Sequence, residues 1–334
     1  MTTMIFISGV LFGAILQYAN LNKYNVISGL AIRENYAVAK AIAIAIGAGA
    51  IMLNIEIATG LAGYHIKPFI LGGLITGGLI FGSGMAILGY CPGTLAVSAG
   101  EGSLDAVTGI AGGLTGGLFY TLILPYIKPF LGPNLGKISL NTVTGTNALF
   151  FVLLLLTGMV FILLSFWLHK KDNDKSKKWV FSGIALALLN VILFSNNFAG
   201  RPAGASTTFP YLADLLTGTV NNNYFAEIKT AGHWEFIFLI GAFVSGLTIS
   251  LIKKDFKLTL IHENWKIHKG NSKIKRVLWS FAGGFILITG ARMAGGCTSG
   301  HILSGGMQLA FGSLFFAIFV FAGLLLTGKF FYKQ

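Results

Sequence analysis

Nine stretches of this chain are each long and apolar enough to cross a lipid bilayer, and this feature restricts the fold more than any other. A spanning helix needs about 20 mainly apolar residues. The predicted spans cover residues 2–20, 36–59, 68–90, 105–127, 146–168, 179–198, 233–252, 277–296 and 308–328. We therefore expect an all-α polytopic membrane protein.

The composition excludes the other classes of protein. Apolar residues make up 54% of the chain and charged residues 10%, against about 25% charged in a soluble domain. Such a chain is too apolar for a disordered or soluble protein. The 45 glycines show no collagen period and suit closely packed or broken membrane helices. The apolar run from Met4 to Gln17 lacks a basic segment before it, so we expect a first span rather than a cleavable signal peptide.

Three short pieces rich in Gly, Ser and Thr separate some of these spans. They cover residues 91–103, 201–218 and 297–307. They are polar enough to break a helix, yet too short and uncharged to form solvated domains. Non-helical backbone at membrane depth requires protein or water around it. We therefore expect re-entrant half-helices at these places.

The distribution of Lys and Arg predicts the orientation. If the spans alternate in direction, 18 of these residues fall on one side, 5 on the other, and Arg292 lies inside a span. The side with fewer Lys and Arg residues holds Lys67, Lys128, Lys137, Arg201 and Lys229. The positive-inside rule places the rich side in the cytoplasm, with the N-terminus outside and the C-terminus inside. The net charge of +13 thus reflects topology, and we expect no nucleic-acid partner.

The chain contains an internal repeat around its only two cysteines. The segment 81–91 aligns with 287–297 at a constant offset of 206 residues, so that Cys91 matches Cys297. Four spans per half and one connecting span account for all nine. Because an odd number of spans separates the start of one repeat from the start of the next, the second copy is inverted in the membrane, as in many transporters. We expect a first repeat with its connecting span at 1–168, a basic linker at 169–178 and a second repeat at 179–334.

Both cysteines are predicted to lie where a half-helix begins. Pro92 disfavours helical backbone at Cys91 and suits the first position of a new helix, which continues through Gly93. In the second repeat, Thr298 or Ser299 can cap a helix after Cys297, in a segment that continues through Gly300 and His301. Free N–H groups and the positive end of the helix dipole favour an anion at both sites.

Other roles for the cysteines receive less support. A lone membrane cysteine is usually a small apolar residue, but two at matching breaks favour a function. A Cys91–Cys297 disulfide is an alternative. Metal binding would use these two cysteines and His301, which are fewer ligands than a structural zinc site has. His301 could instead donate to a backbone carbonyl. We expect no metal and no cofactor.

The two cysteine segments resemble those of the YeeE/YedE family of sulfur-compound transporters. The similar parts are Gly82-x-Gly84-x4-Gly89-Tyr90-Cys91-Pro92-Gly93, the segment from Gly290 to His301, and Asn197–Pro202. The resemblance implies an inner-membrane permease for thiosulfate, in which cysteines line a narrow path and pass the ion along by S–H···S contacts. It also implies a cytoplasmic sulfur-carrier protein as a partner.

The chain departs from that family at two places. Its first-half motif reads Gly89-Tyr90-Cys91-Pro92-Gly93, where the family pattern is Gly-Gly-Cys. Thiosulfate-transporting members carry a third cysteine after the first span, where this sequence has Asn22 and Lys23. A selenium compound or another sulfur species is therefore an alternative substrate. A membrane thiol-redox protein is the alternative function. We favour a permease that is not an enzyme.

Two arginines are the remaining candidates for substrate binding. Arg292 lies inside a span, where an ionisable group usually faces the bundle interior. It would attract a dianion, or else pair with a helix C-terminal carbonyl, Glu56 or Glu101. Arg201 is expected at the outer mouth, where it would collect an anion or remain a solvated loop residue. Glu101 is explained by capping and is not expected to bind substrate.

Overall fold

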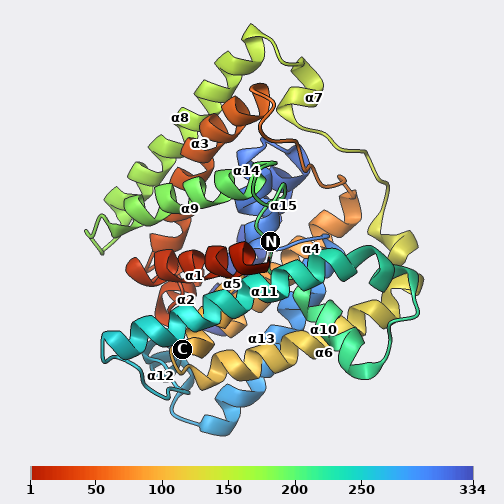
Figure 1. Cartoon of the computed structure of the whole chain (residues 1–334). Coiled ribbons are helices and arrows are strands. Elements are labelled where there is room, and N and C mark those ends of the chain that lie inside the picture. Colours follow the sequence, from red (N-terminus) through yellow and green to blue (C-terminus); the bar gives the residue numbers. More distant parts are fainter. Residues whose placement is uncertain (1, 334) are drawn as a thin grey trace.

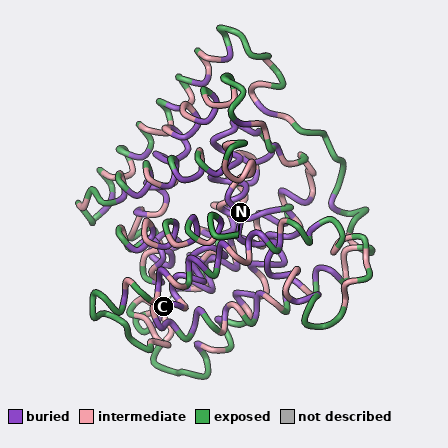
Figure 2. The backbone as a smooth tube through the Cα atoms, viewed as in Figure 1, coloured by how far each residue is buried: buried purple, intermediate pink, exposed green. Residues whose placement is uncertain are grey.

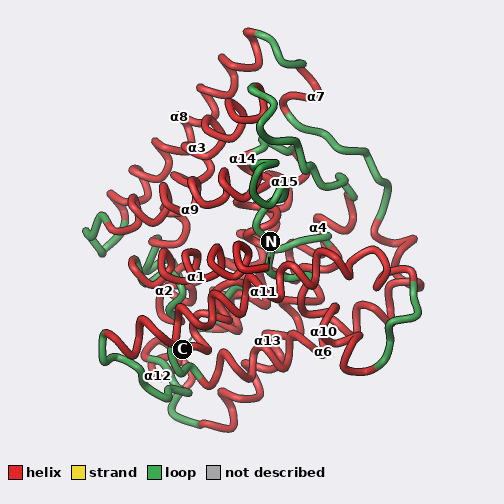
Figure 3. The backbone as a smooth tube through the Cα atoms, in the orientation of Figure 1, coloured by secondary structure: helices red, strands yellow, loops and turns green. Residues whose placement is uncertain are grey.

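The computed structural model describes residues 2–333, and its regular structure is entirely helical apart from isolated β-bridges (Figures 1 and 3). Seven segments are long and apolar enough to cross a membrane, and α1 and α9 are shorter apolar helices. The prediction of a polytopic all-α membrane protein is confirmed. The long helices are α1 (Thr2–Tyr18), α3 (Ala37–Ala58), α4 (Leu71–Leu88), α6 (Leu104–Ile127), α8 (Ala148–Lys171), α9 (Lys178–Phe194), α11 (Asn223–Ile252), α13 (Lys273–Met293) and α15 (Phe311–Phe331).

Short helices occupy the breaks and the loops. Those at the predicted breaks are α5 (Pro92–Gly100), α10 (Thr208–Thr217), η2 (Thr298–Leu303) and α14 (Ser304–Met307). Those not predicted are α2 (Tyr24–Ala31), η1 (Lys128–Leu131), α7 (Leu140–Thr144) and α12 (Glu263–Lys269). Helix α11 is longer than the predicted span 233–252. It begins at Asn223, where the Asn222 side chain accepts from the Phe225 N–H at 2.7 Å.

The loops lie on two opposite faces of the bundle. On one face, Ser103 bridges Thr259, and the Asn264 N–H donates to Asn25. This face carries the loops 19–36, 172–177 and 253–272, and we call it the basic face. On the other face, isolated bridges join Ala62 to Ser195, Ile70 to Asn134 and Ser139 to Ala310. The long helices between the two sets of loops have the lengths that bilayer spans require.

One lysine counted among the loop cations is in fact buried in a helix. Lys40 lies in the first turn of α3, and its Nζ is 2.6 Å from Asp172 Oδ2, with both side chains fully buried. The Asp172 carboxylate also accepts from the Tyr36 N–H at 3.1 Å. The pair thus joins α3 to the linker that follows α8.

The two broken helices α4 and α13 cross at their glycines. A Cβ atom added at Gly84 would come within 2.6 Å of Leu287 Cα, and one at Gly290 within 2.9 Å of Phe81 Cα. In the 206-residue repeat, Gly84 corresponds to Gly290 and Phe81 corresponds to Leu287. Each of the two contacts is therefore the repeat equivalent of the other. The crossing therefore has the pseudo-two-fold relation that an inverted repeat requires.

Burial is greatest around this crossing and falls toward α8 (Figure 2). Helix α8 exposes Leu155, Leu156, Val160 and Leu163. An apolar surface of this kind suits contact with lipid rather than water. The broken segments α5, η2 and α14 lie in the buried interior, where the surrounding helices shield their backbone.

The glycine crossing predicts a stability effect that opposes helix propensity. Alanine favours a helix over glycine by about 1 kcal/mol, but at Gly290 its methyl group would collide with the α4 backbone, and overpacking costs about 1–3 kcal/mol. We expect Gly290→Ala to lower the melting temperature of the purified protein. Gly63→Ala is the control, since nothing lies within 4 Å of its added Cβ. Equal melting temperatures for all three proteins would contradict this account.

Candidate functional site

The first cysteine lies at the start of a half-helix, as predicted. Helix α4 ends at Leu88, and Gly89 adopts left-handed backbone with φ of 79°. Cys91 is the N-cap of α5, and Pro92 is its first residue. The Cys91 N–H donates to Thr94 Oγ1 at 2.8 Å, and that hydroxyl lies 3.4 Å from Cys91 Sγ. The thiol therefore stands at a helix N-terminus beside a hydroxyl group.

The second cysteine lies at a matching break. Gly295 adopts left-handed backbone with φ of 74°, and Cys297 is the N-cap of η2, a π-helical turn. Cys297 Sγ lies 3.2 Å from Ser299 Oγ. The prediction that Thr298 or Ser299 caps this helix is wrong, because Cys297 holds that position. Within residues 2–333, the buried Thr298 Oγ1 has no hydrogen-bond partner.

The two breaks meet at one cavity. Cys91 and Thr94 line it from the first half, and Thr298 and Ser299 from the second. It measures about 70 Å³, and the rest of its lining is apolar. Both cysteines are free thiols. Pro92 and Gly93 pack toward neighbouring helices instead, since Pro92 faces α10 and α11 and Gly93 lies against Phe12.

Arg292 is buried among hydroxyl groups near the second break. Its Nε donates to the Tyr224 hydroxyl at 2.8 Å, and its Nη1 donates to Thr207 Oγ1 at 3.1 Å. The pairings considered with Glu56 and Glu101 are not formed, because within residues 2–333 Arg292 makes no ion pair. A guanidinium with hydroxyl partners alone keeps its full charge in the site.

Two further charged residues lie near Arg292, and the sequence did not indicate them as site residues. Lys67 Nζ donates to the Gly295 carbonyl at 2.6 Å and occupies the space beside Gly296 and Gly300. Burial, followed by the charge of Arg292, lowers the pKa of Lys67 to about 8. Glu235 Oε2 accepts from the Thr207 N–H at 2.6 Å. The only signal for Lys67 was its place on the face that is poor in cations.

Arg201 completes this charged group. Its Nη2 lies 3.8 Å from Glu235 Oε1, and its guanidinium covers the Trp234 ring at 4.5 Å from the centroid. The group thus contains three cations, Lys67, Arg201 and Arg292, with Glu235 as the carboxylate among them. We call it the cation cluster. It lies next to Cys297, on the side away from the basic face.

His301 has partners within the protein on both ring nitrogens. Nε2 lies 2.8 Å from the Ala294 carbonyl, and Nδ1 lies 2.9 Å from Ser313 Oγ. A neutral ring donating from Nε2 and accepting at Nδ1 satisfies both contacts. The alternative in which His301 satisfies a carbonyl therefore agrees with this geometry. No group of three or more His, Cys, Asp or Glu side chains placed to hold a metal occurs in residues 2–333.

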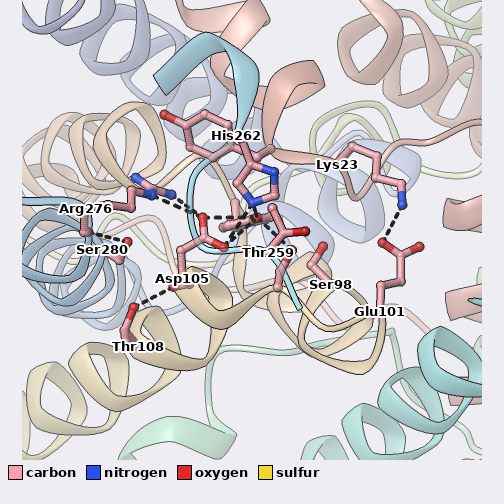
Figure 4. A network of polar contacts seen from close by, with 12 residues as sticks. Lys23, Ser98, Glu101, Asp105, Thr108, Thr259, His262, Arg276 and Ser280 are labelled. Carbon is pink, nitrogen blue, oxygen red and sulfur yellow. Dashed lines mark hydrogen bonds and ion pairs between the residues drawn. The ribbon is translucent and has the colours of Figure 1, made fainter. Parts of the chain in front are cut away.

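A buried network fixes the first break from the basic face (Figure 4). Arg276 donates to Asp105 through Nε at 3.2 Å and to the Leu88 carbonyl through Nη2 at 2.8 Å. His262, from the loop before α12, lies 3.1 Å from Asp105 Oδ1 and 3.0 Å from the Tyr90 hydroxyl. The last turn of α4 and the residue before Cys91 are therefore both held by these side chains.

Asn22 and Lys23 lie at the far end of α5. Lys23 Nζ is 2.8 Å from Glu101 Oε2, and the buried Asn22 donates to the same oxygen at 2.9 Å. Gln17 donates to the other Glu101 oxygen at 2.8 Å. Gln17, Asn22 and Lys23 thus all contact the Glu101 carboxylate.

Comparisons with known proteins identify the family of the chain. A family model described as sulphur transport matches residues 23–326. A curated relative, "Thiosulfate transporter TsuA" from Spirochaeta thermophila, is 24% identical over 332 residues, which cover 94% of each chain.

The Asp105–Arg276 pair should dominate the stability of the first break. Both side chains are fully buried, and removing one partner of such a pair costs about 3–5 kcal/mol. We expect Arg276→Gln to lower the melting temperature markedly. Arg276→Lys should restore little of this loss, because lysine lacks the planar guanidinium that makes several hydrogen bonds at once. The double variant Asp105→Asn/Arg276→Gln should lose less than the sum of the single losses. The exposed Lys273→Gln is the control, and an equal effect there would contradict the assignment.

Proposed function

The chain belongs to the sulphur transport family, as its resemblance to YeeE/YedE transporters indicated, and we propose that it takes up thiosulfate or a related sulfur-containing anion. It is a transport protein rather than an enzyme. The proposed route crosses the bacterial cytoplasmic membrane between the two half-helices. It passes Cys297 first and Cys91 second.

The observation that carries this proposal is the meeting of the two breaks at one cavity, which Cys91 lines from the first break and Thr298 and Ser299 line from the turn that Cys297 caps. Each half-helix N-terminus offers backbone N–H groups to an anion. Each thiol adds a polarizable S–H donor, and Thr94, Thr298 and Ser299 add hydroxyl donors. A sulfur-containing anion could therefore replace its hydrating water molecules with these donors along a short part of the route. The unpartnered Thr298 hydroxyl is available for such a contact.

The cation cluster supports entry from the side away from the basic face. Three cations against one carboxylate leave an excess of positive charge, which raises the local concentration of a dianion. Glu235 and the hydroxyls around Arg292 limit the strength of this attraction. Binding that is favourable yet limited suits conduction, because the ion must also leave.

Apart from Cys91 and the hydroxyl-bearing residues, the cavity at the two breaks is lined by Leu21, Ile27, Val38 and other apolar side chains, which would form a barrier to a hydrated ion. At the end of α5, Lys23 could exchange its contact with Glu101 for the leaving anion. This polar group would act in place of a third thiol and would affect which anions pass.

The basic face is proposed to lie in the cytoplasm. The positive-inside rule favours this orientation, and it places the N-terminus outside and the C-terminus inside. The loop 253–272 would then be available to a cytoplasmic sulfur-carrier protein, which would accept the transported sulfur. We further propose the two inverted repeats at 1–168 and 179–334, joined by the linker 169–178.

Loss of either thiol should abolish transport. We expect Cys91→Ser and Cys297→Ser to eliminate uptake of labelled thiosulfate into proteoliposomes, because serine keeps a donor but lacks the soft sulfur. Met159→Leu, which removes a sulfur from the exposed surface of α8, should transport normally. Full uptake by the double serine variant would refute the cysteine route. Sulfate, sulfite and selenite as competitors would define the substrate.

The role of Lys67 predicts a dependence on external pH. Its lowered pKa of about 8 means that Lys67 is charged at pH 7 and mostly neutral at pH 9, whereas arginine stays charged. We expect the apparent KM to rise by about tenfold over this range, the factor that corresponds to about 1.4 kcal/mol. Lys67→Arg should flatten the profile, and Lys67→Gln should raise KM even at pH 7. An unchanged slope in Lys67→Arg would assign the titration to a group other than Lys67.

The orientation is testable by labelling. In a background without Cys91 and Cys297, a cysteine introduced by Ser176→Cys should resist an impermeant maleimide applied to intact cells. Asn134→Cys, on the opposite face, should react. The reverse pattern would invert the topology.

A further inference from the structure

We propose that a groove between α3, α8 and α15 binds one anionic phospholipid, with its headgroup at the basic face. The groove has a volume of about 670 Å³ and is lined almost wholly by apolar side chains. Along α3 it extends from Tyr36 to Ile46, which at about 1.5 Å per residue is roughly 15 Å. This length matches about half of a bilayer core of about 30 Å. An acyl chain from one leaflet therefore fits the groove.

The end of the groove at the basic face opens to a cationic pocket. This second cavity, of about 430 Å³, shares Arg33 and Leu325 with the groove and adds Lys329, Lys333 and His268. Among residues 2–333, the buried His268 Nδ1 has no hydrogen-bond partner. The pocket thus offers three basic side chains, Arg33, Lys329 and Lys333, to a ligand.

The arrangement of nearby carboxylates leaves this positive charge uncompensated. Arg33, Lys329 and Lys333 form no ion pair within residues 2–333. Asp172, which follows α8, is already paired with Lys40. Glu34 and Glu263 are exposed and do not line the pocket. An anionic headgroup therefore complements the pocket, whereas a zwitterionic headgroup would bring a repelled cation.

The turn that ends α2 determines the position of the Arg33 side chain. Arg33 has φ of 65°, a conformation that residues other than glycine rarely adopt. The turn is fixed by the Glu34 N–H, which donates to the Gly29 carbonyl at 2.8 Å. These contacts form a common helix C-terminal motif, in which Arg33 is the left-handed residue after the Ile32 C-cap. The turn places Arg33 in the lining of both the groove and the pocket.

The groove is separated from the cysteine cavity by a single layer of side chains. Leu30, Ile42, Ile302 and Phe321 line both spaces. Ile302 belongs to η2, the turn that begins after Cys297. An acyl chain in the groove would press on the outer side of this layer and support η2. The lipid would thus help to hold the second cysteine segment in place.

The test measures lipid binding to the purified full-length chain by native mass spectrometry. The ligands are phosphatidylglycerol and phosphatidylcholine with the same acyl chains. The pocket variant is Arg33→Asn/Lys329→Gln/Lys333→Gln, in which asparagine tolerates the positive φ. The control is Lys253→Gln/Lys257→Gln/Lys266→Gln, which removes three exposed cations from the same face. Unliganded melting temperatures show that each variant is folded.

We expect the wild type and the control to prefer phosphatidylglycerol by about tenfold to hundredfold, since each surface cation near an anionic lipid contributes about fivefold. The pocket variant should lose most of this preference. Ala317→Phe, which fills the groove and leaves the cations intact, should weaken binding of both lipids. Equal losses in pocket variant and control would overturn the proposal. So would full competition by glycerol phosphate, which has the headgroup charge without acyl chains.

Discussion

The crossing of α4 and α13 is the contact on which the rest of this structure depends. Glycines at the crossing allow two helix backbones to approach more closely than any side chain would permit. Apolar burial supplies little net attraction between helices in lipid, so close packing must supply it. Because both helices break soon after the crossing, their approach also brings the two cysteine segments to one cavity. The same residues therefore determine the packing of the bundle and the position of the site.

The sequence predicted the parts of the fold that depend on local composition. Spans and breaks follow from runs of apolar residues and from residues such as Pro92, so their ends agree closely with the structure. The start of α11 was missed because Glu227, Lys229 and His233 give its first turns a polar face. Apolar neighbours such as Phe225, which stacks on Tyr211, nevertheless hold this part as a helix.

The pairing of charges could not be predicted in the same way. Asp105 and Arg276 are distant in the chain, as are Lys40 and Asp172, and nothing in the local sequence indicates their partners. Lys67 belongs to a loop that looks solvated until the fold brings it against Gly295. Cys91, Cys297 and Arg292 were found because an ionisable or repeated residue inside an apolar span is itself a signal. The residues that modulate them carry no such signal.

The buried Lys40–Asp172 pair has a consequence for how the protein is made. Asp172 follows Lys40 by 132 residues in the chain, so at about 5–20 residues per second roughly 7–26 s of synthesis separate the two. During this interval α3 carries a lysine without its carboxylate and must hold the ammonium at the membrane surface, as long basic side chains do. The buried pair between α3 and the linker can therefore form only after α8 has been synthesised.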